Sequence, residues 1–208
     1  MERAVERGVS QYVILGAGLD SFAYRRTDLA SVLRVFEVDH PATQAWKRRR
    51  LGEEGIDLPP NLNLVPVDFE KQSLLEGLRA SDYRTNLPAV FSWLGVTMYL
   101  SEATAMSVLG AIANLPRGSG VVFDYAINPM ELTEPVRKAV EFMASRVAAA
   151  GEPWTLFFDP ARLARSLDAL GYTHVDDLDG EAINARYFDG RADGLQVGSA
   201  GRLLYAEV

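Results

Sequence analysis

The chain contains no cysteine among its 208 residues. This absence excludes a disulfide framework, a thiolate zinc site and a cysteine nucleophile. The sequence also lacks an apolar run approaching the ~18 residues that a membrane-spanning helix needs. Its first residues, MERAVER, are charged and have no apolar core, so they do not resemble a signal peptide. We therefore expect a cytoplasmic protein with no membrane partner.

Basic residues are in the minority, with 21 Lys and Arg against 28 Asp and Glu, for a formal net charge of −7. Nucleic-acid binding depends on Lys and Arg contacts to phosphates, so nucleic acid is not an expected partner. The basic cluster Lys47–Arg50 is interpreted as the solvated end of a helix, where the helix dipole favours cations. The chain has 2 histidines, His40 and His174, and neither has a ligand partner at metal-binding spacing. We expect no metal site.

Apolar strand-like segments alternate with helical segments along the whole chain. Strands are predicted at residues 11–15, 32–38, 62–67, 89–93, 118–125, 172–178 and 202–208. Helices are predicted at residues 42–54, 102–114, 131–150 and 160–170. This order predicts one α/β domain over residues 1–208, built on a doubly wound, mostly parallel sheet with helices on both faces in three layers. Residues 131–160 are expected to form a lid or insertion on the substrate side.

The loop Gly16-Ala17-Gly18 follows the first predicted strand. Ligands of such sheets bind outside the carboxyl ends of the strands. Two glycines let the backbone turn tightly and let a ligand approach where a Cβ would otherwise stand. The dinucleotide fingerprint requires a third glycine where this chain has Ser21. The loop therefore favours a nucleoside ligand without pyrophosphate over NAD or FAD, although turns of this kind also occur without a ligand.

Carboxylates end the next two predicted strands. Asp39, which lies 21 positions after Gly18 (39 − 18), can accept both ribose hydroxyls of an adenosine, or can cap the following helix. Glu37, two positions earlier, can share that task or face a backbone amide. Asp68 can accept a hydrogen bond from an adenine amino group while Phe69 lies beside the base. An N-cap for the helix after Asp68 is an equally weighted alternative.

Four ordered segments and two later ones carry a resemblance to a known family. QYVILGAGLDSFAYRR, FEVDHP, VPVDFE and PAVFSWLGVTMYLSEAT, together with GEPWTLFFDPARLARSLDALGY and RADGLQVGSAGRLLYAEV, resemble the leucine carboxyl methyltransferase-like family over essentially the whole chain. That family includes bacterial S-adenosyl-L-methionine-dependent methyltransferases and O-methyltransferases of polyketide pathways. The resemblance implies a Rossmann-like class I methyltransferase sheet with an antiparallel C-terminal strand. It also implies S-adenosyl-L-methionine as cofactor and O-methylation of a hydroxyl or carboxylate on a small-molecule acceptor.

The resemblance also implies roles for individual residues. The segment Gly16–Gly18 would wrap the methionine part of the cofactor, Asp39 would hold the ribose, and Asp68 with Phe69 would hold the adenine. We also place Trp93, at the end of the fourth predicted strand, in the cofactor site. Aromatic residues near the fifth strand and the long helix predict an apolar acceptor pocket. The candidates on this acceptor side are Tyr99, Tyr125 and Trp154.

Two departures from the family pattern leave alternatives open. Family members carry some tens of residues before the first residue of this sequence, including an arginine that reaches the cofactor carboxylate. The resemblance thus implies that the usual N-terminal segment is lacking, and a second copy of the chain is a candidate cover for the apolar surface left behind. Many relatives have a glutamate where this chain has Leu94, and no catalytic base is assigned, with Asp124 as one candidate. The alternatives are a truncated, non-catalytic cofactor-binding domain and an NAD-dependent oxidoreductase.

Overall fold

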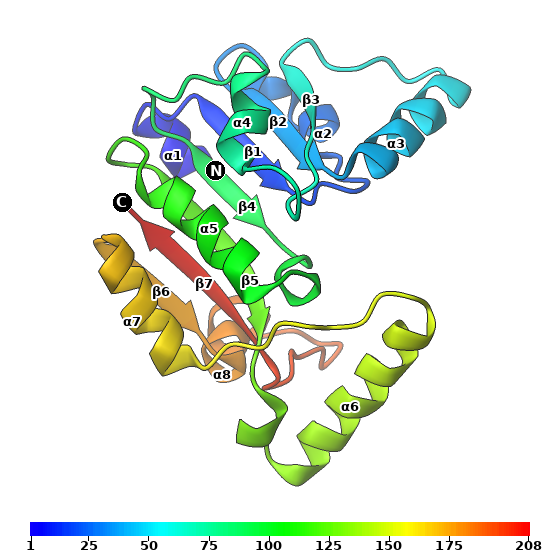
Figure 1. The fold of residues 1–208 in the computed structure, drawn as a ribbon, viewed down its shortest axis with the longest axis vertical. Coiled ribbons are helices and arrows are strands. Elements are labelled where there is room, and N and C mark those ends of the chain that lie inside the picture. Colours follow the sequence, from blue (N-terminus) through cyan, green and yellow to red (C-terminus); the bar gives the residue numbers. More distant parts are fainter.

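The computed structural model describes residues 1–208 as one seven-stranded sheet with helices on both faces (Figure 1). The strand order is β3-β2-β1-β4-β5-β7-β6, with β1 to β5 parallel and β7 antiparallel to both β5 and β6. The strands are β1 (Gln11–Leu15), β2 (Arg34–Asp39), β3 (Leu62–Pro66), β4 (Val90–Trp93), β5 (Gly120–Ala126), β6 (His174–Leu178) and β7 (Gly201–Glu207). The doubly wound sheet and its antiparallel C-terminal strand are confirmed.

One helix precedes the first strand, and the others occupy the connections between the strands. They are α1 (Glu2–Glu6), α2 (Phe22–Arg25), α3 (Pro41–Glu53), α4 (Leu74–Arg79), α5 (Glu102–Ala113), α6 (Glu134–Ala149), α7 (Pro160–Leu170) and α8 (Gly180–Ile183). In Figure 1, α4, α5 and α7 lie in front of the sheet, while α1, α2 and α8 lie behind it. Helix boundaries follow local capping chemistry: the N-cap of α7 is Asp159, whose side chain accepts from the Arg162 amide, and its C-cap is Gly171 with a φ of +94°. None of these helices is long and apolar enough to cross a membrane.

The chain reverses its direction of travel across the sheet between β1 and β4. It runs from β1 outward to β2 and β3, then returns to place β4 on the other side of β1. Such a reversal opens a crevice outside the carboxyl ends of the two central strands. The arrowheads of β1, β2 and β4 point toward the side on which α6 lies (Figure 1). The loops after β1, β2, β3, β4 and β5 therefore share one edge of the molecule.

Two apolar clusters hold the layers together. The larger one has 28 buried residues, and it includes Phe91 and Trp93 of β4, Phe123 of β5 and Leu109 of α5. A smaller cluster of 6 buried residues lies around β1 and β2, with Ala17 of the glycine loop among its members. Burial of this size is the main favourable contribution to folding. The two clusters hold the strands in fixed positions, and the candidate site described below is built from residues at the ends of those strands.

Several predicted boundaries shift in the structure. Leu62–Pro66 is an edge strand that ends at Pro66, as expected for a residue that cannot donate to a ladder. The long helix predicted at 131–150 begins instead at Glu134, because Thr133 is its N-cap and Pro135 stands in its first turn. A separate 3₁₀ turn, Pro129–Glu131, precedes it. Helix α6 buries Val140 alone and extends away from the sheet (Figure 1).

Candidate functional site

The loop after β1 turns sharply over the end of β2. The amides of Gly16 and Ala17 both donate to the Val38 carbonyl, at 2.8 and 3.2 Å. Gly16 and Gly18 have φ angles of +65° and +49°, in the left-handed region that favours glycine. The loop is thereby tied to β2 on one side and presents Gly18 at the carboxyl edge of the sheet.

The two glycines serve different purposes. A Cβ at Gly16 would overlap the Val96 side chain from the loop after β4, whereas a Cβ at Gly18 would meet nothing within 4 Å. Gly16 is thus required by the close approach of two loops, whether or not a ligand also approaches its backbone. Gly18 faces open space, as a ligand-binding glycine should.

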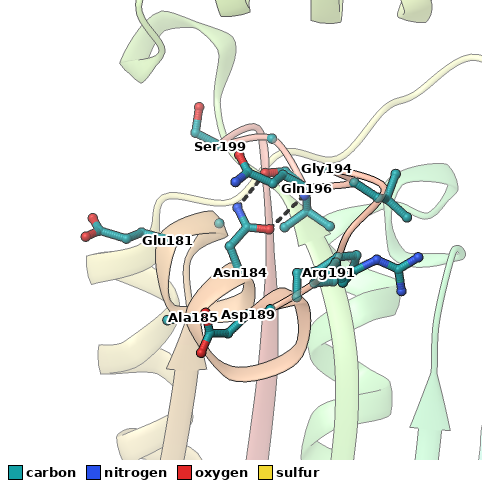
Figure 2. A pocket seen from close by; sticks show the side chains of 14 residues that line it. Glu181, Asn184, Ala185, Asp189, Arg191, Gly194, Gln196 and Ser199 are labelled. Carbon is teal, nitrogen blue, oxygen red and sulfur yellow. Dashed lines mark hydrogen bonds between the residues drawn. The ribbon is translucent and has the colours of Figure 1, made fainter.

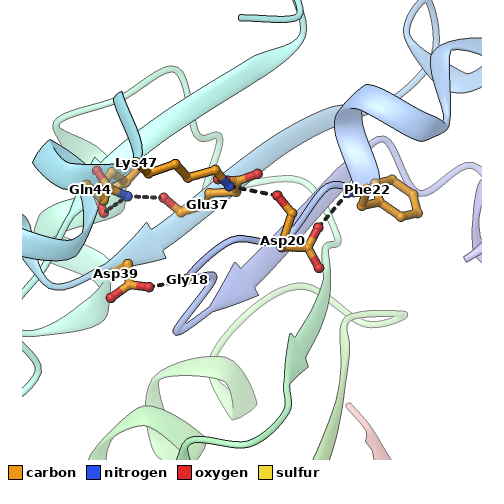
Figure 3. Close-up of polar contacts among 8 residues, drawn as sticks. Gly18, Asp20, Phe22, Glu37, Asp39, Gln44 and Lys47 are labelled. Carbon is orange, nitrogen blue, oxygen red and sulfur yellow. Dashed lines mark hydrogen bonds and ion pairs between the residues drawn. The ribbon is translucent and has the colours of Figure 1, made fainter. Parts of the chain in front are cut away.

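Asp39 connects the end of β2 to the glycine loop (Figure 3). Its Oδ2 accepts a hydrogen bond from the Gly18 amide, and its Oδ1 accepts one from the His40 amide at 2.6 Å. The N-cap of α3 is His40, whose Nδ1 accepts from the Ala42 amide at 3.2 Å. The alternative in which Asp39 caps the helix is therefore wrong. Each carboxylate oxygen of Asp39 accepts one amide and keeps further acceptor capacity.

Asp68 follows β3 at the same edge. Its Oδ1 accepts from the Glu70 amide at 3.1 Å, and its Oδ2 pairs with the Lys71 ammonium at 2.7 Å. The hydrogen bond from Lys71 holds the pKa of the Asp68 carboxyl below its usual range. Asp68 closes a turn and caps no helix, because α4 begins three residues after Lys71 with Ser73 as its N-cap.

Asp68 also lies near Asp39, because His40 contacts both of them. The His40 Nε2 is 3.7 Å from the Asp68 Oδ2, and the His40 amide donates to Asp39. Phe69 is partly buried and packs against the larger apolar cluster. The structure thus brings Gly18, Asp39 and Asp68 into one continuous stretch of the edge.

Behind the glycine loop lies a buried ion pair that the sequence interpretation missed (Figure 3). The Lys47 ammonium donates to the Glu37 carboxylate and to the Asp20 carbonyl, the latter at 2.7 Å. Glu37 and Lys47 are 1% and 3% exposed. Burial raises the pKa of Glu37, and the Lys47 ammonium opposes that rise. Gln44 donates to the Glu37 and Val65 carbonyls at 2.6 and 3.1 Å.

Two expectations are corrected by this pair. Glu37 lies beneath the glycine loop with Lys47 as its partner, so it does not share the edge with Asp39. Lys47 is not part of a solvated helix end, whereas Arg48, Arg49 and Arg50 are exposed as expected. The signal for Lys47 was its spacing three residues after Gln44, which puts both on the inward face of α3.

The loop after β4 lies between the glycine loop and β5 and contacts both. The Gly95 amide donates to the Asp124 Oδ1 at 2.7 Å, and the Thr97 hydroxyl donates to the Asp124 carbonyl at 2.7 Å. Leu94 is 52% exposed. Burial raises the pKa of Asp124, and the Gly95 amide opposes the rise. Asp124 is thus a half-buried carboxylate with no cationic partner.

The acceptor-side candidates separate in the structure. Tyr125 and Trp154 both line a pocket of about 430 Å³ between the ends of β5 and β7 and helix α6, and Asp124 lines it too. Tyr99 is 41% exposed and lies outside that lining. Trp93 is wholly buried in the larger cluster and has no exposed surface to offer a cofactor, so its predicted place in the cofactor site is wrong.

A second cavity, of about 620 Å³, lies between α8 and the loop that leads to β7 (Figure 2). The Asn184 amide binds the Val197 backbone twice there, with donor and acceptor distances of 3.0 and 2.9 Å. Its charged lining includes Arg191, which pairs with Asp193 outside the lining. Val197 and Gly198 line this cavity and the apolar pocket alike. These two residues therefore form a wall shared by the cavity and the pocket.

The site residues follow the strand order along one edge. Asp68 follows β3, Asp39 ends β2, the glycine loop follows β1, Gly95 and Val96 follow β4, and Asp124 lies on β5 beside the pocket. The edge therefore presents polar acceptors at the β2 and β3 end and an apolar pocket at the β5 end. No group of three or more His, Cys, Asp or Glu side chains is arranged to hold a metal ion.

The sequence and the fold are both similar to those of known proteins. The family model for leucine carboxyl methyltransferase matches residues 1–113, which is more than half of the chain. This chain belongs to the leucine carboxyl methyltransferase family. A relative from Bacillus subtilis, named "Putative S-adenosyl-L-methionine-dependent methyltransferase YktD", is 37% identical over 189 residues, or 90% of this chain and 62% of the relative. A Mycobacterium avium relative with the same general name is 30% identical over 208 residues, or 99% of this chain and 64% of the relative.

Solved structures agree on the fold of this family member. A DUF574 family protein from Streptomyces avermitilis matches with a TM-score of 0.63 at 17% identity, covering 98% of this chain and 77% of that one. Human N-acetylserotonin methyltransferase in complex with SAM matches with a TM-score of 0.57 at 12% identity, covering 99% of this chain and 50% of that one. At such identities the likeness establishes the class I methyltransferase fold alone.

Proposed function

We propose that this protein is an S-adenosyl-L-methionine-dependent O-methyltransferase that methylates a hydroxyl or carboxylate of a small molecule. The observation that carries the proposal is the pairing of Asp39 with the Gly18 amide at the carboxyl ends of β2 and β1. An acceptor carboxylate beside an open glycine loop, at the point where the sheet reverses, suits a nucleoside with a vicinal diol. Family membership supports the same cofactor.

The residues present fit that cofactor. Gly18 faces open space, so the backbone can be approached closely. Each Asp39 oxygen accepts one amide hydrogen bond and can accept another, which matches two adjacent ribose hydroxyls. Asp68 would accept a hydrogen bond from an adenine amino group, with its Lys71 partner exposed and free to move aside. No phosphate-binding glycine stands at Ser21, which supports a nucleoside without pyrophosphate.

The bound cofactor supplies an electrophilic methyl group on a sulfonium sulfur. This chain's contribution is positioning, which can account for a large part of the acceleration of a bimolecular transfer. The loop Gly16–Gly18 would hold the methionine end of the cofactor, Asp39 the ribose next to it, and Asp68 the adenine at the far end. The Gly95 amide binds Asp124 and the Val96 side chain lies against Gly16, so the loop after β4 connects the glycine loop with the pocket beside Asp124, where we place the acceptor.

The test is calorimetric titration of S-adenosylhomocysteine into the protein and its Asp39→Ala variant. Loss of the ribose contacts should weaken binding several-fold to a hundred-fold, or about 1–3 kcal/mol. Asp82→Ala is the matched control, because Asp82 is an exposed carboxylate that pairs with Arg34 at the amino end of β2, opposite the end that carries Asp39. Unchanged affinity in Asp39→Ala would remove the ribose assignment.

Two further measurements separate this proposal from the alternatives. Stabilisation against thermal unfolding by NAD, with none by S-adenosylhomocysteine, would favour an oxidoreductase. Transfer of labelled methyl groups to a library of small hydroxyl and carboxylate compounds tests turnover directly. Tight cofactor binding without transfer to any compound would contradict the methyltransferase proposal and support a domain that binds without catalysis.

A further inference from the structure

The pocket beside Asp124 has a distinctive lining. It opens between the carboxyl end of β5, the start of β7 and helix α6, and its volume of about 430 Å³ is in the range of small-molecule sites. Most of its walls are apolar. The apolar side chains that line it are Met98, Tyr125, Ala126, Val140, Met143, Trp154, Ile183, Val197, Ala200 and Leu203.

Two charged side chains line the pocket, and they differ in whether they have a partner. Arg202 donates from Nε to the Asp177 Oδ1 at 3.0 Å and from Nη2 to the Asp177 carbonyl at 3.3 Å, and its Nη1 lies 4.0 Å from Asp179. Its guanidinium is therefore already matched by two carboxylates. Asp124 accepts hydrogen bonds on Oδ1 from the Gly95 amide, and no cation pairs with it.

The balance of charge in the pocket decides which acceptors it can hold. A carboxylate ligand would find no uncommitted cation among the lining residues and would face the Asp124 anion across a partly desolvated space. Like charges placed together in such an interface cost several-fold to many-fold in affinity. A neutral hydroxyl compound meets no such repulsion, and its O–H can donate to the free Oδ2 of Asp124.

Trp154 lines the pocket, and its one polar side-chain atom is buried beneath the pocket surface. Its indole Nε1 is buried and has no hydrogen-bond partner, although buried N–H groups are almost always paired. The neighbouring Thr155 amide and hydroxyl are held by the Met98 and Leu100 carbonyls at 2.8 and 3.1 Å, so this segment is fixed against the loop after β4. A ligand oxygen that reached the indole would satisfy an unpaired donor.

We infer that the pocket selects a neutral, largely apolar hydroxyl compound as the methyl acceptor and rejects carboxylates, with Asp124 as the residue that sets this specificity. The inference rests on the proposed function, since it identifies the acceptor class for that transfer. Of the two acceptor groups in the proposed function, the charges in the pocket favour the hydroxyl over the carboxylate.

The test uses 2-naphthol and 2-naphthoate, which share a ring system and differ in charge at neutral pH. Each is titrated into the protein in the presence of saturating S-adenosylhomocysteine and followed through the indole N–H resonances of ¹⁵N-tryptophan-labelled protein. The chain has 3 tryptophans, and the Trp154 resonance is assigned by its loss in Trp154→Phe. We expect 2-naphthol to shift the Trp154 resonance and to bind about tenfold or more tightly than 2-naphthoate, given one uncompensated like charge.

The Asp124→Asn variant isolates the role of the charge. Asparagine keeps an oxygen for the Gly95 amide but removes the anion, so the preference for 2-naphthol should fall to about threefold or less. Asp176→Asn is the matched control, because Asp176 lies on β6, pairs with Arg186 and does not line the pocket. That variant should keep the full preference.

The outcomes distinguish the inference from the function on which it rests. Equal binding of the two probes, tighter binding of 2-naphthoate, or a Trp154 resonance that neither probe moves would overturn the inference. An unchanged preference in Asp124→Asn would overturn the role of Asp124. Binding of S-adenosylhomocysteine is measured separately by calorimetry, so its failure would overturn the proposed function regardless of how the probes behave.

Discussion

The two ends of the functional edge are built in opposite ways. At the β2 end, Glu37 and Lys47 form a nearly inaccessible ion pair that also binds the Asp20 carbonyl under the glycine loop. At the β5 end, the pocket is walled partly by α6, a 16-residue helix whose buried residue is Val140. Phe142 and Met143 of that helix are 62% and 55% exposed.

Under the proposed function, this contrast corresponds to a prebuilt cofactor site and an adaptable acceptor site. A loop fixed by buried hydrogen bonds presents the same geometry to every ligand, which suits a cofactor that never changes. A helix with little buried surface opens at low free-energy cost, which suits acceptors that must enter and products that must leave. The comparison is testable at both ends.

The largest expected effect comes from removing one partner of the buried pair. Lys47→Met leaves the Glu37 carboxylate buried without its cation, and breaking a buried pair in this way costs about 3–5 kcal/mol of the free energy of unfolding. The same change frees the Asp20 carbonyl, so S-adenosylhomocysteine binding should weaken as well. Urea unfolding and calorimetric titration measure the two effects.

Two controls sharpen this prediction. Arg48→Met alters the neighbouring exposed cation of α3 and should change the free energy of unfolding by less than about 0.5 kcal/mol. The double variant Glu37→Gln with Lys47→Met removes both charges and should be more stable than Lys47→Met alone. If the double variant is the less stable of the two, the uncompensated carboxylate is not the cause of the loss.

The next effect separates the two glycines of the loop. Gly16→Ala places a side chain at φ +65° and against Val96, so strain and overpacking should together cost about 2–4 kcal/mol. Gly18→Ala meets open space and should cost about 1–2 kcal/mol, the strain of φ +49° alone. Thermal and urea unfolding of both variants compare them, and Val96→Ala should partly rescue Gly16→Ala. Equal losses in the two single variants would contradict the packing role of Gly16.

Much of the fold was predictable from the sequence, because its signals are local. Buried parallel strands require short apolar runs, and Pro66 at a strand end correctly predicted an edge strand. The predicted start of α6 was less accurate, since Thr133 and Pro135 start this helix at Glu134 while helical periodicity extends to Glu131. Periodicity defines the face of a helix better than its first residue.

The position of a candidate site residue was predictable where it depends on that residue alone, and not where it depends on a partner distant in the sequence. The place of Asp39 at the sheet edge follows from its position at the end of a predicted strand. Burial of Lys47 does not follow from a basic run, because only its partner Glu37 on β2 distinguishes it from Arg48. Trp93 looked like a site aromatic, but its burial depends on how β4 packs against α5 and β5, which is a property of the whole core.

The smallest expected effect concerns α6, and it tests most directly whether the two ends of the edge differ in rigidity. Val140→Ala removes the one buried side chain of α6 and should lower the free energy of unfolding by less than about 1 kcal/mol. Val38→Ala, in the fully buried strand β2, should lower it by about 2 kcal/mol. Hydrogen exchange should show α6 amides exchanging well before those of β2, and faster still in Val140→Ala, because local opening of α6 exposes little apolar surface. If α6 is protected as strongly as β2, or if the two valine variants lose equal stability, then the acceptor end is as rigid as the cofactor end and the division between them does not hold.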